Sequence, residues 1–136
     1  MDILQLRSWA PRALAALRIV TALLFIEHGT QKLFGFPPFQ MPQPDVLSLL
    51  WIAGMLELVG GVLVLLGLFT RPVAFILSGE MAVAYFMVHA PQSFFPVLNA
   101  GESAILYCFI FLYLVFAGPG AWSADAARLD THPAGA

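Results

Sequence analysis

Charged side chains are scarce in this sequence. Asp, Glu, Lys and Arg make up 10% of the 136 residues, whereas 60% are hydrophobic, and the mean hydropathy is +0.86. Soluble domains carry about 25% charged residues, so this chain lacks the polar surface that a water-soluble protein needs. The composition therefore predicts a membrane protein, and the length suits a single domain over residues 1–136.

The sequence also has a single cysteine and no cluster of basic residues, and each of these features excludes a class of function. The lone cysteine, Cys108, excludes an internal disulfide, a C-x-x-C dithiol centre and iron–sulfur ligation within this sequence. No Gly-rich loop of the Rossmann type occurs, and we expect no metal site. The net charge is −2 and no basic patch could neutralise phosphates, so we expect no nucleic-acid partner.

What the sequence does contain is four long apolar stretches. They predict an all-α protein, a polytopic bundle of four transmembrane helices in a lipid bilayer. The expected spans are residues 13–34, 46–69, 72–89 and 100–117. Asp45 is the expected N-cap of the second span, and the tail from Trp122 onward is expected to be irregular.

The basic residues predict the orientation of this bundle. With four spans, Arg7, Arg12, Arg71 and Arg128 fall on one side of the membrane and Lys32 alone on the other. Cytoplasmic ends of membrane helices carry the excess of Lys and Arg. We therefore expect both termini to be cytoplasmic.

Polar residues inside the apolar stretches point to a site. An ionisable side chain at membrane depth is costly and normally faces a protein interior or water. At about 1.5 Å per residue, two glutamates lie near mid-depth and a further group lies in an outer layer, which predicts an outward-opening polar site. The candidates for binding a ligand or a proton are Glu27, His28, Lys32, Glu57, Glu80, His89, Asn99 and Glu102. No residue is assigned as catalytic.

Several of these residues also have structural interpretations. Glu57 could form an ion pair with Lys32 or with Arg18, the structural ion-pair candidate, and Lys32 could instead extend to the membrane interface. Two carboxyl groups at one depth, Glu57 and Glu80, would favour a shared proton. The spacing of Asn99 and Glu102 matches a capping box.

Aromatic residues and glycines leave further alternatives open. Tyr85 and His89, four residues apart, or Trp51 could line a slot for a flat ring, and plain packing is the alternative. A stripe of small residues, Ala53, Glu57 and Gly61 flanked by Gly54 and Gly60, favours close helix contact. That contact could lie within one protomer or form a homodimer.

Four ordered blocks give the chain a family resemblance. They are Arg18 followed by LLFIEHGTQKLFGF (23–36), AGMLELVGGVLVLLGLFTRPVA (53–74), MAVAYFMVHAPQSFFPVLNAGESAILY (81–107) and GPGAWSAD (118–125). The chain resembles the DoxX family across residues 13–125. The resemblance implies four transmembrane helices in the bacterial cytoplasmic (inner) membrane and a link to thiosulfate:quinone oxidoreductase or to other redox complexes.

Two classes of function are compatible with these observations. The first is a membrane subunit of a quinone-linked redox system, an oxidoreductase component that receives electrons from a soluble redox partner or a bound cofactor. In it, His28 or His89 would bind a quinone carbonyl and a glutamate would handle the proton; a haem between the two histidines is less favoured. The second is a non-enzymatic membrane protein that binds a lipid or small amphiphile or assists assembly of a partner. Proton-coupled transport ranks last.

Overall fold

The computed structural model describes residues 2–38 and 42–131, and within these ranges the secondary structure is helical. This confirms the predicted all-α class. The elements are α1 (Ile3–Phe34), α2 (Leu49–Leu66), α3 (Thr70–Ala84) continued by the π-helix η1 (Tyr85–His89), α4 (Pro96–Asn99), α5 (Glu102–Ala117) and α6 (Ala124–Thr131).

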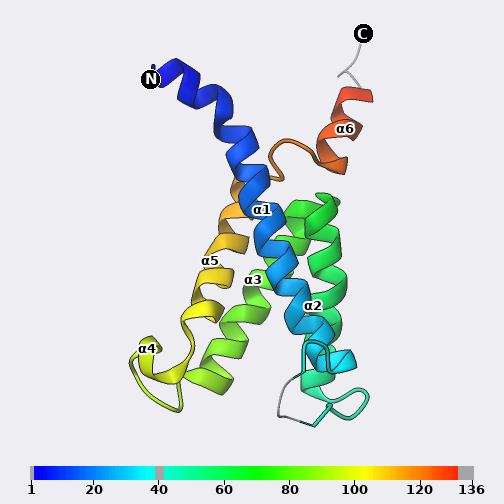
Figure 1. Cartoon of the computed structure of the whole chain (residues 1–136), viewed down its shortest axis with the longest axis vertical. Coiled ribbons are helices and arrows are strands. Elements are labelled where there is room, and N and C mark those ends of the chain that lie inside the picture. Colours follow the sequence, from blue (N-terminus) through cyan, green and yellow to red (C-terminus); the bar gives the residue numbers. More distant parts are fainter. Residues whose placement is uncertain (1, 39–41, 132–136) are drawn as a thin grey trace.

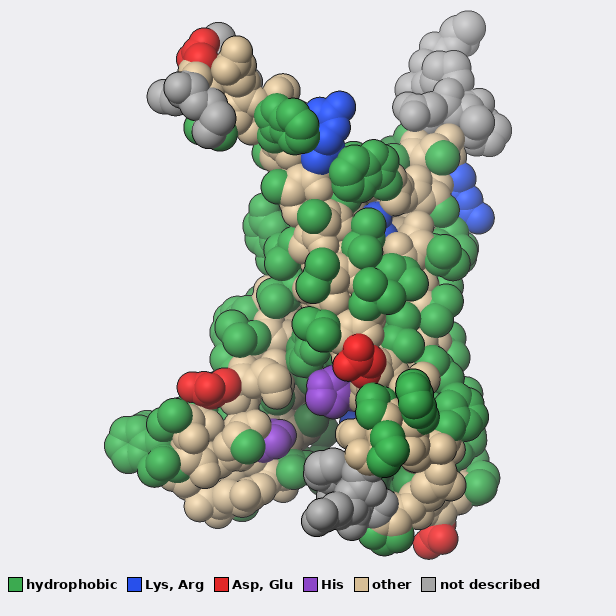
Figure 2. All heavy atoms as spheres, in the orientation of Figure 1, with side chains coloured by type: hydrophobic (Ala, Val, Ile, Leu, Met, Phe, Trp, Pro, Cys, Tyr) green, Lys and Arg blue, Asp and Glu red, His purple; other side chains and the backbone are tan. Residues whose placement is uncertain are grey.

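Three of the helical segments are long and apolar enough to cross a bilayer, and the fourth is shorter. The three are Gln5–Phe34, Leu49–Leu66 and Thr70–His89, whereas the apolar helix Glu102–Ala117 has 16 residues. Large hydrophobic side chains cover much of the outer surface, as they would against lipid. In Figure 2 the Lys and Arg side chains lie mostly near the end that holds the termini, and the histidine side chains of the described residues lie nearer the opposite end.

The helices are arranged as two pairs. α1 packs along α2 and α3 packs along α5, whereas α1 and α5 touch little. Figure 1 shows the pairs diverging toward the end opposite the two termini. The core between them is built from large apolar side chains such as Phe25, Leu77, Phe111 and Leu114, all buried.

Glycines set the close approach of α1 to α2. A Cβ on Gly29 would lie 2.6 Å from the backbone nitrogen of Leu58, and a Cβ on Gly61 would lie 2.7 Å from a side-chain carbon of Ile26. Small residues allow helices to approach closely. Of the predicted small-residue stripe, Gly54 and Gly61 face α1, whereas Gly60 faces Leu77 of α3.

Arg18 corrects one expectation from the sequence. Arg18 and Lys32 were alternative partners for Glu57, and the structure pairs Glu57 with Lys32; the fully buried guanidinium of Arg18 donates to backbone carbonyls at the terminal end of the bundle. The acceptors are Val64 and Leu65 at the end of α2, and Pro119, Ala121 and Trp122 in the segment after α5. A helix leaves its last carbonyls without partners, and a guanidinium offers five N–H donors. Arg18 therefore binds backbone carbonyls, and the carboxylate of Glu57 pairs with Lys32 instead.

The described part of the tail after Trp122 forms a helix, α6, where the sequence predicted irregular structure; residues 132–136 lie outside the described residues. Asp125 accepts hydrogen bonds from the backbone N–H groups of Phe69 (2.9 Å) and Thr70 (2.8 Å), and its own N–H donates to the Gly67 carbonyl. Burial raises the pKa of Asp125, but the hydrogen bonds from Thr70 and Phe69 outweigh it and the pKa lies below its ordinary value. Asp125 therefore caps the N-terminus of α3 from a distant part of the chain.

Two predicted caps are wrong. Ser48, rather than Asp45, is the N-cap of α2 and accepts from Trp51 N–H at 3.2 Å. Gly101 precedes α5, so Glu102 is its first residue and the capping box with Asn99 does not form. The start of α2 is shifted because Ser48 lies three residues after Asp45. The start of α5 is shifted because Asn99 already belongs to the short helix α4.

Candidate functional site

A cavity of about 100 Å³ lies between the two helix pairs, toward the end where they diverge. Figure 2 shows the face of the molecule hollowed in this region, next to histidine side chains. Its wall is formed by α1, α2, α3 with its continuation η1, and α5. Its lining residues are Phe25, His28 and Lys32 from α1, Glu57 from α2, Met81 and Ala84 from α3, His89 from η1, and Ser103, Ala104 and Tyr107 from α5.

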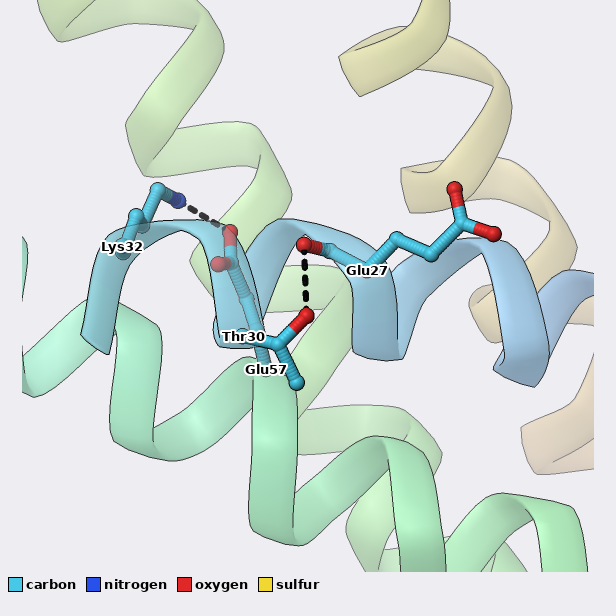
Figure 3. A network of polar contacts seen from close by, with 4 residues as sticks. All are labelled: Glu27, Thr30, Lys32 and Glu57. Atoms are coloured by element: carbon cyan, nitrogen blue, oxygen red, sulfur yellow. Dashed lines mark hydrogen bonds and ion pairs between the residues drawn. The ribbon is translucent and has the colours of Figure 1, made fainter. Parts of the chain in front are cut away.

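An ion pair forms the polar wall of this cavity. Lys32 Nζ donates to Glu57 Oε1, and Glu57 is only 2% exposed (Figure 3). Gly54 makes room for the lysine, because a Cβ there would lie 3.1 Å from Lys32 Cβ. The second oxygen, Glu57 Oε2, is buried and has no hydrogen-bond partner among the described residues. A buried carboxylate oxygen without a donor is energetically costly. A hydrogen bond from a ligand in the cavity to Glu57 Oε2 would remove that cost.

Two histidines from different helix pairs line the same cavity. The His28 ring meets Tyr107 edge-on, with centroids 5.8 Å apart, and the His89 ring stacks on Tyr85 at 6.3 Å. His89 Nδ1 lies 2.9 Å from the Asn99 carbonyl. Because a carbonyl only accepts, Nδ1 carries the hydrogen in this contact, which leaves Nε2 of the neutral ring as an acceptor.

The π-helix gives a local reason for the position of His89. In η1 the chain makes the wider i to i+5 turn, and Ala90 N–H reaches the Tyr85 carbonyl at 2.9 Å. Such turns rotate the residues after them relative to a regular α-helix and occur often at functional sites. The apolar pattern of residues 72–89 predicted a helix but gave no sign of this turn.

Glu80 adds a second carboxyl group to the cluster. It lies on α3, and both of its oxygens are buried without a hydrogen-bond partner among the described residues. It is within electrostatic range of Glu57 and Lys32. The cluster therefore holds one ammonium group and two carboxyl groups.

The structure thus brings together part of the predicted residue set. His28, Lys32, Glu57 and His89 line the cavity, and Glu80 interacts with two charges of the same cluster. Glu27 is exposed, and Figure 3 shows its carboxylate pointing away from the Lys32–Glu57 pair.

Asn99 and Glu102 lie outside the cavity lining. Asn99 is buried and serves the loop before α5: its amide donates to the Ser93 carbonyl and its side-chain oxygen accepts from Gly101 N–H, both at 2.8 Å. Glu102 is exposed at the start of α5. Of the ring-slot candidates, Tyr85 supports His89, and Trp51 is not part of the lining.

The α5 side of the cavity was missed from the sequence. Ser103 and Tyr107 are four residues apart, so their side chains fall on the same face of α5, and Ala104 leaves space beside them. Two hydroxyl groups one turn apart in an otherwise apolar helix were the available signal. It is weak, because such residues also occur singly on lipid-facing surfaces.

Comparisons with known proteins agree with the membrane character of the fold. The DoxX family model matches residues 13–90. A protein of Haemophilus influenzae, named only as an uncharacterized protein, is 48% identical over 125 residues, covering 88% of this chain and 93% of the relative. An uncharacterized membrane protein of Mycobacterium tuberculosis is 27% identical over 137 residues, covering 88% of this chain and 83% of the relative. No solved structure matches significantly.

Proposed function

Because the chain belongs to the DoxX family of membrane proteins, we propose that it is the membrane subunit of a quinone-linked redox system. The cavity between the helix pairs binds the ring of the quinone. The observation that carries this proposal is the buried, unpartnered Glu57 Oε2 in a cavity wall that also holds Lys32, His28 and His89.

The chemistry of the wall favours a ring with polar groups at its edge. Phe25, Met81 and Ala84 supply apolar surface for the ring, while Lys32 donates and Glu57 Oε2 accepts. His89 Nε2 is a second acceptor when the ring is neutral. Two acceptors favour hydroxyl groups, so the reduced quinol form fits the polar wall better than the oxidised quinone, whose oxygens only accept.

In this proposal the protein's own side chains transfer the protons, and another molecule transfers the electrons. Reduction of a quinone consumes protons together with electrons, and Glu57 and the two histidines are ionisable groups in the cavity wall. The sequence has a single cysteine and no nucleotide-binding loop. We therefore place the electron donor or acceptor on a soluble partner protein or a bound cofactor.

The proposal includes a location and an orientation. We place the chain in the bacterial inner membrane with both termini in the cytoplasm, because Arg7 and Arg12 lie in the N-terminal part of α1 and Arg71 lies in the first turn of α3, next to the end of α5. The cavity then lies toward the outer side. Labelling of single cysteines at residues 9 and 94 with a membrane-impermeant thiol reagent in intact cells, in a Cys108→Ser background, tests this. Labelling of position 94 alone is expected, and labelling of position 9 alone would contradict it.

Binding of decylubiquinone and its reduced form to the purified protein, measured by isothermal titration calorimetry in detergent, tests the function. Glu57→Gln replaces the free acceptor with an amide and should weaken quinol binding at least tenfold. His89→Ala should weaken it less, because it removes one of two acceptors. The matched control is Glu27→Gln, an exposed glutamate on α1 whose carboxylate points away from the pair.

The control should bind as the wild type does. Failure of the wild-type protein to bind either form would refute the quinone proposal. So would equal weakening in Glu27→Gln, since that residue has no place in the cavity.

Amphiphile binding without electron transfer is the second candidate function. It is favoured by the limited contact between α1 and α5, two helices that both border the cavity and expose apolar side chains such as Leu24 and Leu106. A lipid chain lying against these residues would place its polar group at Glu57. Mass spectrometry of molecules that co-purify with the protein distinguishes the candidates, because a phospholipid or fatty acid in place of a quinone supports the second.

A further inference from the structure

Glu80 is the buried ionisable group that ligand binding in the cavity leaves unexplained. Both of its carboxyl oxygens are buried without a hydrogen-bond partner among the described residues, although the side chain sits in the polar cluster beside the cavity. Glu57 Oε2 is in the same condition. Glu57 and Glu80 interact electrostatically, and together they present three carboxyl oxygens that lack a donor among the described residues.

Charge balance shows what is missing. Lys32 supplies one positive charge and donates to one carboxylate, Glu57. If Glu80 were also ionised, the cluster would hold one uncompensated negative charge among apolar helices, where ionised groups are strongly disfavoured. One added positive charge restores neutrality, and a proton also turns one acceptor oxygen into a donor.

We propose that Glu80 and Glu57 hold one proton between them, forming a resident proton-binding site in the cavity wall that is filled before any ligand arrives. The proton resides mainly on Glu80, because Lys32 already compensates the charge of Glu57. This inference rests on the carboxyl pair and is independent of which ligand the cavity takes.

The surrounding groups are compatible with this assignment. The charges that act on Glu80 are Glu57 from α2 and Lys32 from α1. From the other sides, His28 on α1 and Tyr107 on α5 interact with Glu57. None of these groups supplies a hydrogen bond to Glu80, so the added proton is what its carboxyl group requires.

The site would connect the protein interior to the cavity. Glu57 belongs both to the carboxyl pair and to the cavity lining, and its free Oε2 is an acceptor available on the cavity side. A hydroxyl group of a bound molecule that donates to Oε2 would compete with the shared proton. Occupancy of the cavity should therefore change the vibrational frequency of the shared carboxyl group.

Infrared spectroscopy of the ligand-free protein in lipid nanodiscs tests the inference directly. The wild type at neutral pH should show the C=O stretch of a protonated carboxyl group, shifted on transfer to heavy water. Glu80→Gln should abolish this band. Glu27→Gln and Glu102→Gln, which alter exposed glutamates of α1 and α5, should leave it unchanged.

Each other outcome overturns the proposal. A wild-type spectrum without a protonated carboxyl band means that both carboxylates are ionised, and loss of the band in Glu27→Gln assigns it elsewhere. A band that disappears when sodium replaces choline in the buffer identifies a metal cation as the occupant.

If Glu80→Gln does not fold, Glu80→Asp is the alternative variant. It retains a carboxyl group, whose infrared band must change frequency; an unchanged frequency contradicts the assignment of the band to Glu80. Because no ligand is added, failure of quinone binding would not affect this result.

Discussion

Two buried charged clusters in the described part of the chain differ in how their polar groups are satisfied. At the terminal end, Arg18 is fully buried and its guanidinium donates to carbonyls of α2 and of the segment after α5. At the opposite end, Lys32 compensates Glu57, while Glu57 Oε2 and both oxygens of Glu80 have no partner among the described residues.

The difference separates a structural cluster from a candidate functional one. The guanidinium of Arg18 donates to carbonyls at the end of α2 and in the segment after α5, so the contact ties α1 to both of these backbone segments. The cluster around Glu57 keeps acceptors free next to a cavity. Buried polar groups without partners are rare in native proteins and need an explanation, and the proposed ligand and proton binding would supply one.

Removal of Arg18 should have the largest effect of any single change. Arg18→Ala leaves several buried carbonyls without their charged donor, and hydrogen bonds to charged groups contribute about 1.5–3 kcal/mol each. We expect failure to accumulate as folded protein, measured by size-exclusion chromatography of detergent extracts. Arg12→Ala, at an exposed position on the same helix, is the control. A folded Arg18→Ala protein with wild-type thermal stability would contradict the structural role assigned to the Arg18 cluster.

Breaking the Lys32–Glu57 pair should have the next largest effect. Lys32→Met leaves Glu57 as a buried carboxylate without its partner, which costs about 3–5 kcal/mol when one member of a buried pair is removed. The double variant Lys32→Met/Glu57→Gln should regain most of that stability because no charge is left uncompensated. Thermal unfolding followed by circular dichroism checks both. Equal stability of the single and double variants would show that Glu57 does not depend on Lys32.

Widening the contact between α1 and α2 should cost less. Gly29→Ala places a methyl group against the backbone of Leu58, and overpacking of this kind costs about 1–3 kcal/mol. Gly79→Ala is the matched control, because nothing lies within 4 Å of its Cβ position. That change should stabilise α3 slightly, by about 0.5–1 kcal/mol. Thermal melts of the two variants should therefore shift in opposite directions.

The α6 contact should give the smallest effect, because Asp125 is only partly buried and water screens its interactions. Its pKa is lower in the folded protein than in the unfolded chain, so its contribution is fully present above the unfolded pKa and is lost as pH falls through the folded pKa. Asp125→Asn should slightly lower the melting temperature at pH 7, and the difference from wild type should disappear under acidic conditions. A difference independent of pH would contradict this account.

The sequence predicted much of the fold and only part of the site. Long apolar runs identified the helices, and the depth of Glu57 placed a polar group inside the bundle. The cap at Asp45 failed because Ser48, an equally good N-cap, lies three residues further on, and the cap at Asn99 failed because Asn99 is the last residue of α4. The sequence also shows that the adjacent residues Glu27 and His28 point in different directions on the helix, but it does not show which of them faces the bundle; only His28 lines the cavity.

Composition and hydropathy by themselves determined that this chain is a helical membrane protein, because a backbone surrounded by lipid must satisfy its hydrogen bonds internally. Only the tertiary structure decided the partners of the buried charges. Arg18 and Lys32 are both basic residues of α1, but Arg18 donates to backbone carbonyls such as that of Val64, whereas Lys32 forms an ion pair with Glu57. Which of these a side chain reaches depends on how the helices cross and rotate, and close contacts at glycines such as Gly29 and Gly54 set that geometry.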